Sequence, residues 1–447
     1  ESIKQSFFGR FSYDYEKKYL LDAIGRFDGS TNFATGHVWG FFPSVGAAWI
    51  MSEENFFKNS SALNFISYLK LKANIGLTGD DRINARLWQA RYKVDLVNTG
   101  YLFGNSSTSS ATLNPQQIPN PEISWQKKRT INIGLESAFF NGRLTFGFDY
   151  FHDFIYDEFD KNLDQNFPMY AGFAAPVINH EQHNTYGTEF TIGYNNNLTN
   201  DLSFNGSVNF GFANTVITQI YQNPFKLFEN SNEDWQIDLG TNQKIYNSDN
   251  IGLISKGILK TQADVDALLK QYPNYTLYGK VPEAGWLYYA DQNNDGKIDD
   301  HDMVPMFKNG TDPDIVLGTS IGFNYKGFQF RTNFVASIGG KEMYDTKLLD
   351  PPTTIKNVAS IWADHWSPSN PNGRFPRFDD PTAKSESTFW AVDATMIRIN
   401  NMSLAYTLPN NLIKRTGLSN LRVLVTGNNL WVLKNPQPFK DPYTSHI

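Results

Sequence analysis

Apolar and polar residues alternate along several long segments of the chain. In the segment 64–78, the odd positions from Leu69 to Leu77 are apolar, whereas the even positions from Lys70 to Thr78 are polar or small. An alternation with a period of two residues means that successive side chains point to opposite faces of an extended strand. The segment therefore predicts a β-strand with one apolar face and one polar face.

The same alternation recurs in pairs of segments that flank turn residues. Segments 130–139 and 144–154 flank Asn141-Gly142, a dipeptide that strongly favours a two-residue hairpin turn. Two further hairpins are predicted around the turns at 195–200 and 326–327. With the outer segments, the pattern predicts about twelve strands in all. These are 6–15, 19–27, 40–51, 64–78, 130–139, 144–154, 186–194, 202–212, 315–325, 328–338, 396–406 and 421–431.

The connections between the predicted strands alternate between short and mostly long. The short ones are 16–18, 51–61, 141–142, 195–200, 326–327 and 409–418. The long loops are 80–122, 157–184, 217–312 and 340–388. Short turns at one rim, long loops at the other and strands of about ten residues are typical of outer-membrane barrels. We therefore predict an all-β fold, a transmembrane antiparallel β-barrel. A soluble β-sandwich or propeller is the alternative, but it has no reason to segregate loop lengths by side.

Composition excludes several other classes of protein. The chain has no cysteine, which rules out disulfides, thiolate metal sites and a cysteine nucleophile. A net charge of −6 argues against a nucleic-acid-binding surface. No stretch approaches the roughly 18 apolar residues of a membrane-spanning helix. The mean hydropathy of −0.43 is compatible with a barrel, because half of each strand then faces a polar lumen.

Several short motifs along the chain, and the order in which they occur, resemble those of a known protein family. They are Arg26-Phe27-Asp28-Gly29-Ser30, Phe42-Pro43-Ser44-Val45-Gly46-Ala47-Ala48-Trp49, Leu69-Lys70-Leu71-Lys72-Ala73-Asn74-Ile75-Gly76, Phe140-Asn141-Gly142-Arg143-Leu144, Tyr325-Lys326-Gly327-Phe328 and Ser403-Leu404-Ala405-Tyr406-Thr407-Leu408-Pro409. No single motif decides the matter. Together they resemble the SusC-like (SusC/RagA) TonB-dependent outer-membrane transporters of Bacteroidetes.

The resemblance implies a fold and a function. The family's barrel has 22 strands and an internal plug, so residues 1–447 would be the C-terminal portion of that barrel, and the plug and N-terminal domains would lie outside this chain. The implied activity is import of a bulky nutrient, either an oligosaccharide or a peptide. The implied partners are TonB, reached through an N-terminal segment outside this chain, a SusD-like surface lipoprotein and outer-membrane lipid, with a dimer of transporter–lipoprotein pairs as a further expectation.

Two other functions remain open at the level of the residues. One is a passive outer-membrane porin or adhesin barrel, and the other is a secreted all-β glycan-binding protein. No H-E-x-x-H or G-x-S-x-G motif occurs in the chain, and no set of Ser, His and Asp is visible. We therefore expect no enzymatic activity.

An acidic segment within the third long loop has the spacing of an EF-hand calcium loop. Oxygen donors fall at positions 1, 3, 5, 7, 9 and 12, with Asp in place of Glu at 12 and a glycine, Gly296, at position 6. The donors are Asp291, Asn293, Asp295, the Lys297 carbonyl, Asp299 and Asp302. This pattern predicts a structural Ca²⁺ site, whereas the alternative is a solvated acidic turn.

Aromatic residues in the long loops are candidates for contact with cargo. Planar rings stack on sugars and on peptide side chains, which makes Trp286, Tyr288, Trp362 and Trp366 candidate substrate-binding residues. In loops of this length, aromatic residues also form small hydrophobic cores of the loops themselves. Both interpretations stay open from the sequence.

Overall fold

The computed structural model describes residues 2–95, 112–160, 176–219, 251–307, 313–344, 348–351, 358–414 and 417–435. The chain divides into two compact units. The first holds Glu1–Ile192 and the second holds Gly193–Phe212 and Lys244–Ile447, with short segments between 213 and 243 divided between them. Within the described ranges, no helix combines the length and the apolar character needed to cross a membrane.

Twelve strands form one sheet and follow one another in chain order. They are β1 (Lys4–Tyr15), β2 (Tyr19–Ser30), β3 (Trp39–Ile50), β4 (Ile66–Asp80), β7 (Gln126–Phe139), β8 (Leu144–Asp160), β9 (Ile178–Asn197), β10 (Leu202–Gln219), β17 (Ile315–Tyr325), β18 (Phe328–Ile338), β21 (Met396–Thr407) and β22 (Arg422–Lys434). The pairs between consecutive strands from β1 to β8 and from β10 to β22 are antiparallel. The twelve strands predicted from the alternation are confirmed.

The loops predicted from the sequence differ from the structure at some boundaries. β8 continues to Asp160 and β9 begins at Ile178, so the connection predicted over 157–184 is shorter than expected. The connection at 51–61 is not a bare turn, because it contains η1 (Met51–Glu53), α1 (Asn55–Lys58) and the start of η2 (Ser61–Leu63).

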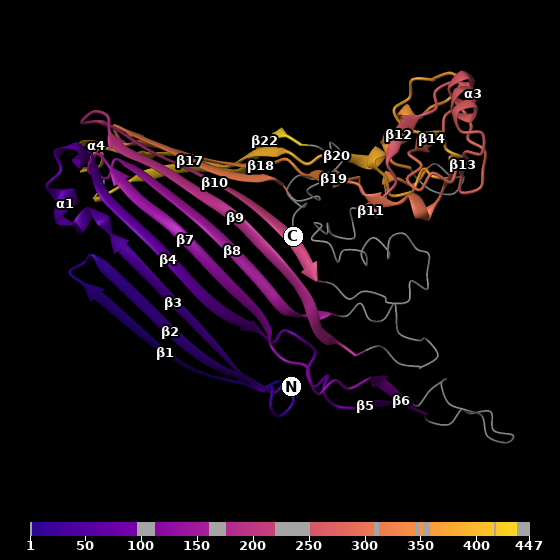
Figure 1. Cartoon of the computed structure of the whole chain (residues 1–447). Helices are drawn as coiled ribbons and strands as arrows, with labels where there is room; N and C mark the ends of the chain where they lie inside the picture. The colour runs from indigo at the N-terminus through magenta and orange to yellow at the C-terminus, as the bar shows by residue number, and fades with distance from the viewer. Residues whose placement is uncertain are drawn as a thin grey trace. The chain divides into compact units, whose positions relative to one another are not determined.

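In the first unit, β1 to β4, β7 and β8 run side by side (Figure 1). Their registers align the apolar positions into rows. One row is Tyr13, Leu21, Ala47, Ala73 and Ile133, each opposite the next across a strand pair. Because the whole row lies on one face, that face is apolar while the residues between carry the charges.

The two ends of these strands are built differently. The turn at 16–18 is tight, with Glu16 and Lys17 in the left-handed region, and Asn141 and Gly142 in the predicted hairpin also have positive φ. α1 lies at this short-turn end, while the ribbon formed by β5 (Arg91–Asp95) and β6 (Thr112–Gln117) lies at the opposite end (Figure 1). The structure thus repeats the contrast between short turns and long loops that the sequence predicts.

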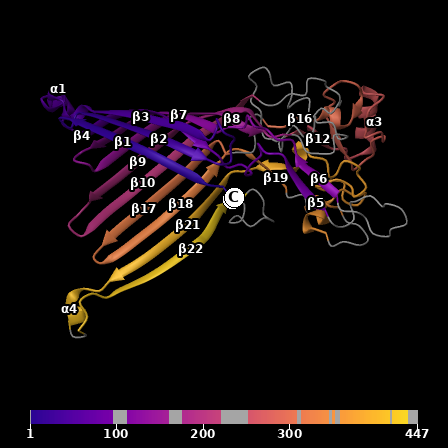
Figure 2. The ribbon, with the colours of Figure 1, turned by 90° about the horizontal axis from the view of Figure 1, so that it is seen from below.

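In the second unit, β17, β18, β21 and β22 run side by side, with α4 (Asn410–Ile413) at their short-turn end (Figure 2). Residues 251–307 and 358–393 fold into a separate structure with its own core, which we name the loop module. Its elements are β11 (Ile251–Gly252), β12 (Ser255–Ile258), α3 (Gln262–Gln271), β13 (Thr276–Leu277), β14 (Leu287–Tyr289), β15 (Lys297–Ile298), η6 (Asp300–Asp302), β16 (Val304–Pro305), η8 (Ser360–Asp364), η9 (Thr388–Trp390) and β20 (Ala391–Asp393), which pairs with β19 (Lys341–Met343).

Candidate functional site

The loop module has two hydrophobic clusters, one formed around each of its two segments. The first cluster consists of Leu253, Tyr275, Leu277, Trp286, Leu287, Tyr289 and Ile298. The second consists of Ile361, Trp362, Phe375, Ala383 and Trp390 of the second segment, together with Leu349, which precedes that segment in the chain. Phe389 packs against both clusters. Two long loops of the sequence therefore fold together as one structure rather than as two separate loops.

A buried carboxylate fastens the two segments together. Asp380, 6% exposed, accepts hydrogen bonds from the backbone N–H groups of Leu287 and Thr382, both at 2.7 Å. Burial raises the pKa of Asp380 above its ordinary value, although these hydrogen bonds act in the opposite direction. Tyr289 adds a hydrogen bond from its hydroxyl to Thr382 Oγ1 at 3.1 Å.

Arg377 makes a second connection at the same joint. Its guanidinium donates to the Ala284 carbonyl at 3.0 Å and pairs with the carboxylates of Glu283 and Asp379. The neighbouring Gly285 has a φ of +94°, and a Cβ there would lie 2.3 Å from the ring of Trp366. A glycine is therefore required both by the backbone conformation and by the close approach of the indole.

Three of the four predicted substrate-binding residues are buried, Trp286 in the first cluster, Trp362 in the second and Trp366 outside both. Trp286, Trp362 and Trp366 are 5%, 2% and 7% exposed. Their indole N–H groups donate internally, to Asp379, to the Leu348 carbonyl and to the Lys260 carbonyl. The packing of these three indoles is that of a loop core, which is the other interpretation the sequence left open. Tyr288 is half-buried against the first cluster. Contact of these four residues with cargo stays a prediction.

The acidic segment 291–302 folds as a compact loop whose carboxylates accept backbone hydrogen bonds. Asp291 accepts from the N–H groups of Asn294 and Gly296 at 2.7 and 2.8 Å, and Asp295 accepts from Lys297 at 2.7 Å. Gly296 has a φ of +81°, as the sharp turn at position 6 requires. The backbone therefore makes the sharp turn at Gly296 that the spacing of the acidic residues predicts.

The last two donors of this segment have other partners. Asp299 accepts from the backbone N–H of His301 at 2.9 Å. Asp302 is fully buried and accepts from the N–H groups of Gln292 and Asp299 at 2.7 and 3.0 Å. Within the described ranges, no three His, Cys, Asp or Glu side chains are grouped so that they could hold a metal ion. The calcium site stays a prediction.

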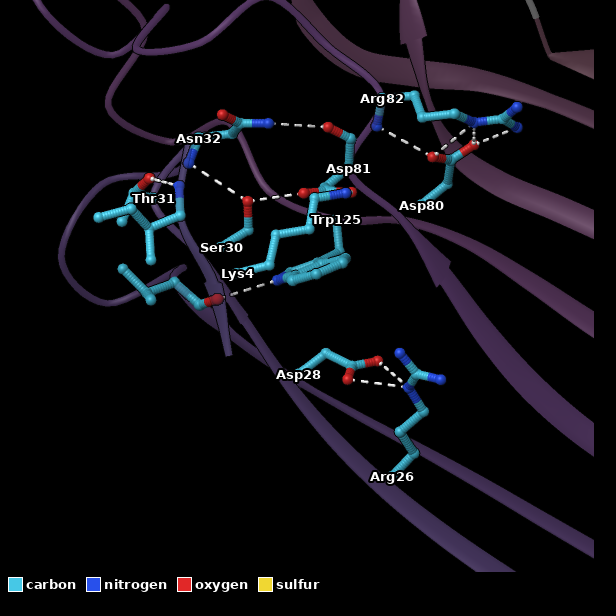
Figure 3. A network of polar contacts seen from close by, with 12 residues as sticks. Lys4, Arg26, Asp28, Ser30, Thr31, Asn32, Asp80, Asp81, Arg82 and Trp125 are labelled. Carbon is cyan, nitrogen blue, oxygen red and sulfur yellow. Dashed lines mark hydrogen bonds and ion pairs between the residues drawn. The ribbon is translucent and has the colours of Figure 1, made fainter. Parts of the chain in front are cut away.

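A polar network in the first unit was not anticipated from the sequence (Figure 3). The carboxylate of Asp81, a residue that is 5% exposed, pairs with Lys4 Nζ at 2.6 Å and accepts from Ser30 Oγ at 2.6 Å. Asn32 donates to the Asp81 carbonyl at 3.0 Å. The only signal available was the charged run Asp80-Asp81-Arg82 where the strand alternation ends.

A hydrophobic cluster lies in the same part of the first unit. Phe33, Phe42, Leu87, Ile123 and Trp125 are all buried there. Trp125 donates from its indole nitrogen to the Val38 carbonyl at 3.2 Å (Figure 3). The N-terminal segment, the β2–β3 connection and the loop after β4 are thereby held together.

The polar face of the strands carries linked ion pairs. Lys72 lies 2.9 Å from Glu136 and 3.0 Å from Asp149, and Lys70 lies 3.2 Å from Glu136. A hollow of about 420 Å³ on the first four strands is lined in part by Arg10, Asp22 and Lys72. This face is charged of both signs and well hydrogen-bonded, as expected of strand positions that face a polar lumen.

Comparison with known proteins gives relatives along nearly the whole chain. No protein-family model matches. TonB-dependent receptor P26 of Formosa agariphila is 28% identical over 441 residues, which cover 95% of this chain and 41% of the relative. TonB-dependent receptor SusC of Bacteroides thetaiotaomicron is 29% identical over 420 residues, 91% of this chain and 38% of the relative. The chain thus spans less than half the length of the curated relatives it matches.

Solved structures share the fold. A structure of the RagAB peptide transporter superimposes with a TM-score of 0.74 at 21% identity, covering 97% of this chain and 44% of that chain. A structure of the RagAB peptide importer in its open-open state gives 0.74 at 20% identity. The relatives are receptors and transporters, in agreement with the expectation that the chain is not an enzyme. Along nearly its whole length the chain is thus similar to TonB-dependent receptors of the outer membrane, SusC among them, and it shares the fold of RagAB.

Proposed function

We propose that the chain forms part of an importer that carries a bulky nutrient, an oligosaccharide or a peptide, across the outer membrane. The observation that carries the proposal is the uneven construction of the two strand ends. In the residues that the structure describes, the short-turn ends hold tight turns and small helices, whereas the longest loops contribute a folded module with a buried core. Long loops of outer-membrane barrels are extracellular. A module of this size at that side suits recognition or retention of a large cargo.

The two edges of the sheet support the further proposal that residues 1–447 are the C-terminal portion of a larger barrel. β1 and β22 are the outermost strands of the twelve-stranded sheet. Unpaired edge N–H and C=O groups are costly in a membrane, where only closed barrels satisfy every strand. Additional strands, a plug and a TonB-contacting segment would then belong to the parts of the protein outside this chain.

The partner and the cargo class rest on the relatives alone. RagAB is described as a peptide transporter, and receptors of the SusC type resemble this chain along 91% of its length. We propose a SusD-like surface lipoprotein as the partner at the long-loop side. Oligosaccharide and peptide both remain candidates for the cargo.

The decisive experiment measures energised uptake by the full-length receptor. Cells that depend on this receptor are supplied with labelled oligosaccharides or peptides, and uptake is compared with that of a variant lacking the TonB-contacting segment. We expect the variant to assemble in the outer membrane but to lose uptake, and an uncoupler to have the same effect on the wild type. Uptake that survives both treatments would identify a passive porin instead. Co-purification of a SusD-like lipoprotein tests the partner separately.

We also propose that the acidic loop binds Ca²⁺ as a structural ion. Four carboxylates, the Asn293 amide oxygen and the Lys297 carbonyl supply about the six to eight oxygens that Ca²⁺ takes. Without a cation, these carboxylates repel one another within one short loop. The proposal requires Asp299 and Asp302 to exchange their present partners for the ion.

Calcium binding is tested by protease protection of the loop in the full-length receptor. We expect chelation to expose the segment 291–302 to cleavage, and Asp295→Ala to remove the dependence on Ca²⁺. Lys297→Ala is the matched control, because only its backbone carbonyl would contact the ion. Equal protection with and without chelator would contradict the proposal.

A further inference from the structure

The apolar face of the first unit is hollowed where two small residues lie side by side. Ala47 of β3 and Ala73 of β4 are directly opposite each other, flanked in the same row by Leu21 and Ile133. Larger side chains on both sides leave a depression of about 510 Å³ with an almost wholly apolar lining. Its size lies within the range of small-molecule binding sites.

Aromatic side chains form the wall of this hollow toward the short turns. Tyr19 and Trp49 line it and stack nearly parallel, with centroids 6.5 Å apart and an interplanar angle of 9°. Both are tied to one carboxylate: Glu54 accepts from the Tyr19 hydroxyl at 2.6 Å and from the Trp49 indole nitrogen at 3.1 Å. A wall fixed before binding lowers the entropy cost of holding a flexible chain.

The position of the hollow indicates which ligand reaches it. Outer-membrane barrels place short turns on the periplasmic side and aromatic girdles at the membrane interfaces. Tyr15 and Tyr19 flank the turn at 16–18, and the Ala47 row follows the Trp49 row toward the centre of the strands. The hollow therefore opens from the periplasmic interface into the hydrocarbon region.

Charged residues of both signs lie in the turn that precedes Tyr19 and in the connection that follows Trp49. Lys17 is exposed in the turn, and Lys58 pairs with Glu53 at 2.6 Å on the neighbouring connection. A headgroup with one phosphate and one amine matches such a mixed rim better than an anionic headgroup does. The surface is continuous with the lipid-facing band of the barrel, so a membrane lipid is the occupant that the location supplies.

We infer that this hollow binds an acyl chain of a zwitterionic phospholipid of the periplasmic leaflet. The acyl chain lies over Ala47 and Ala73 against the wall of Tyr19 and Trp49. The phosphate and amine lie at the rim formed by Lys17, Glu53 and Lys58. This inference depends on the outer-membrane location and goes beyond the proposed import function.

The test uses the full-length receptor extracted in mild detergent and titrated with phosphatidylethanolamine, with bound lipid counted by native mass spectrometry. Ala47→Phe fills the hollow from its floor, and we expect lipid retention to fall at least tenfold. Val45→Phe is the matched control, because Val45 is exposed on the same face of the same strand but does not line the hollow. It should retain lipid within twofold of the wild type.

Other outcomes would overturn the inference. Equal retention by Ala47→Phe and the wild type would exclude the hollow as the site. A lower dimer fraction for Ala47→Phe with unchanged lipid retention would make a second copy of the chain the occupant. Loss of lipid in Val45→Phe to the same extent would mean adventitious annular lipid only. Heat-modifiable migration verifies that each variant has assembled, and Ala73→Leu replaces Ala47→Phe if the latter does not assemble.

A variant outside the hollow tests the wall. Glu54→Ala releases Tyr19 and Trp49, and we expect retention to fall about threefold, less than when the floor is filled. Glu54→Gln keeps an acceptor oxygen and should restore most of the retention. Equal retention by the alanine and glutamine variants would show that the fixed wall does not contribute.

Discussion

The apolar face of the sheet and the loop module use aromatic residues in opposite ways. On the sheet, Phe7 and Phe41 point outward and are 56% and 58% exposed. In the loop module, Trp362 and Trp390 are 2% and 0% exposed and contact Phe375. The chain is 15% aromatic. These aromatic side chains therefore lie in two environments, the hydrocarbon around the strands and the protein interior of the loop module. An aromatic residue in this chain takes its role from its region, not from its type.

The largest expected effect lies in the loop module. Trp390→Ala removes a fully buried indole that stacks on Phe375 and donates to the Ala383 carbonyl at 3.0 Å. Truncation of a buried tryptophan costs about 3–5 kcal/mol. We expect the module to become sensitive to limited proteolysis while the barrel still assembles. Phe41→Ala, the control on the exposed face of the sheet, should leave the module protected. Loss of barrel assembly in Trp390→Ala would show that the two regions do not fold independently.

The next effect separates the two faces of a strand. Leu71 lies on the apolar face of β4, and Leu71→Arg should cost about 2–4 kcal/mol if the site lies at the bilayer midplane. Asn74→Lys adds the same sign of charge to the opposite face of the same strand and should be tolerated. The measurement is the urea midpoint for unfolding of the full-length receptor in lipid vesicles. Equal midpoints for the two variants would mean that the assignment of faces is wrong.

A third effect concerns the buried carboxylate at the joint of the loop module. Asp380→Asn replaces one acceptor oxygen by an N–H₂ group that faces backbone donors, at an expected cost of about 1–3 kcal/mol. Burial raises the pKa of Asp380, so the folded module holds its proton to a higher pH than the unfolded chain does. The free energy of unfolding therefore falls as the pH rises from the unfolded to the folded pKa.

The Asn variant provides the comparison for this pH effect. Asparagine does not titrate. The decrease in the free energy of unfolding that Asp380 causes at rising pH should therefore be absent from the pH profile of the Asp380→Asn variant. Module unfolding is followed by tryptophan fluorescence between pH 4 and 8, a range of roughly four units that spans ordinary and raised carboxyl pKa values. Parallel profiles for the wild type and Asp380→Asn would contradict the assigned role of this carboxylate.

The sequence predicts the sheet well because strand pairing leaves a local trace. Segments 315–325 and 328–338 match β17 and β18, since each position alternates and the turn Lys326-Gly327 marks the junction. β9 begins at Ile178, earlier than the predicted 186, because the residues from Asn179 to Asn184 are polar on both faces and hide the alternation. Pairing with neighbouring strands, not patterning, extends that strand.

The loop module could not be predicted in the same way because its contacts are distant in the sequence. Trp286 donates to Asp379, and Asp380 accepts from Leu287, in each case across 93 positions. No periodicity connects such residues, so a tryptophan in a core and one on a binding surface have the same sequence signature. The acidic loop is an intermediate case, since its spacing predicts the turn at Gly296 but not the partners of Asp299 and Asp302.

The smallest expected effect tests whether the stability of α3 comes from the capping box at its N-terminus or from its packing on the hydrophobic core. The Thr261 side chain accepts a hydrogen bond from the Asp264 N–H at 3.2 Å, and Asp264 Oδ2 accepts from the Thr261 N–H at 2.8 Å. This reciprocal capping box satisfies two backbone donors at the start of the helix.

Leu268 and Leu269 pack α3 against the first cluster of the loop module, and Val265 of the same helix is buried. Because this packing persists in Thr261→Ala, only the capping contribution of about 1 kcal/mol should be lost. Amide hydrogen exchange across 262–271 should then accelerate about fivefold, while exchange in β14 stays unchanged. Gln271→Ala at the exposed end of the helix should have no comparable effect. If exchange in β14 accelerated equally in Thr261→Ala, the helix and the core would open as one unit, and the capping box would stabilise the whole module.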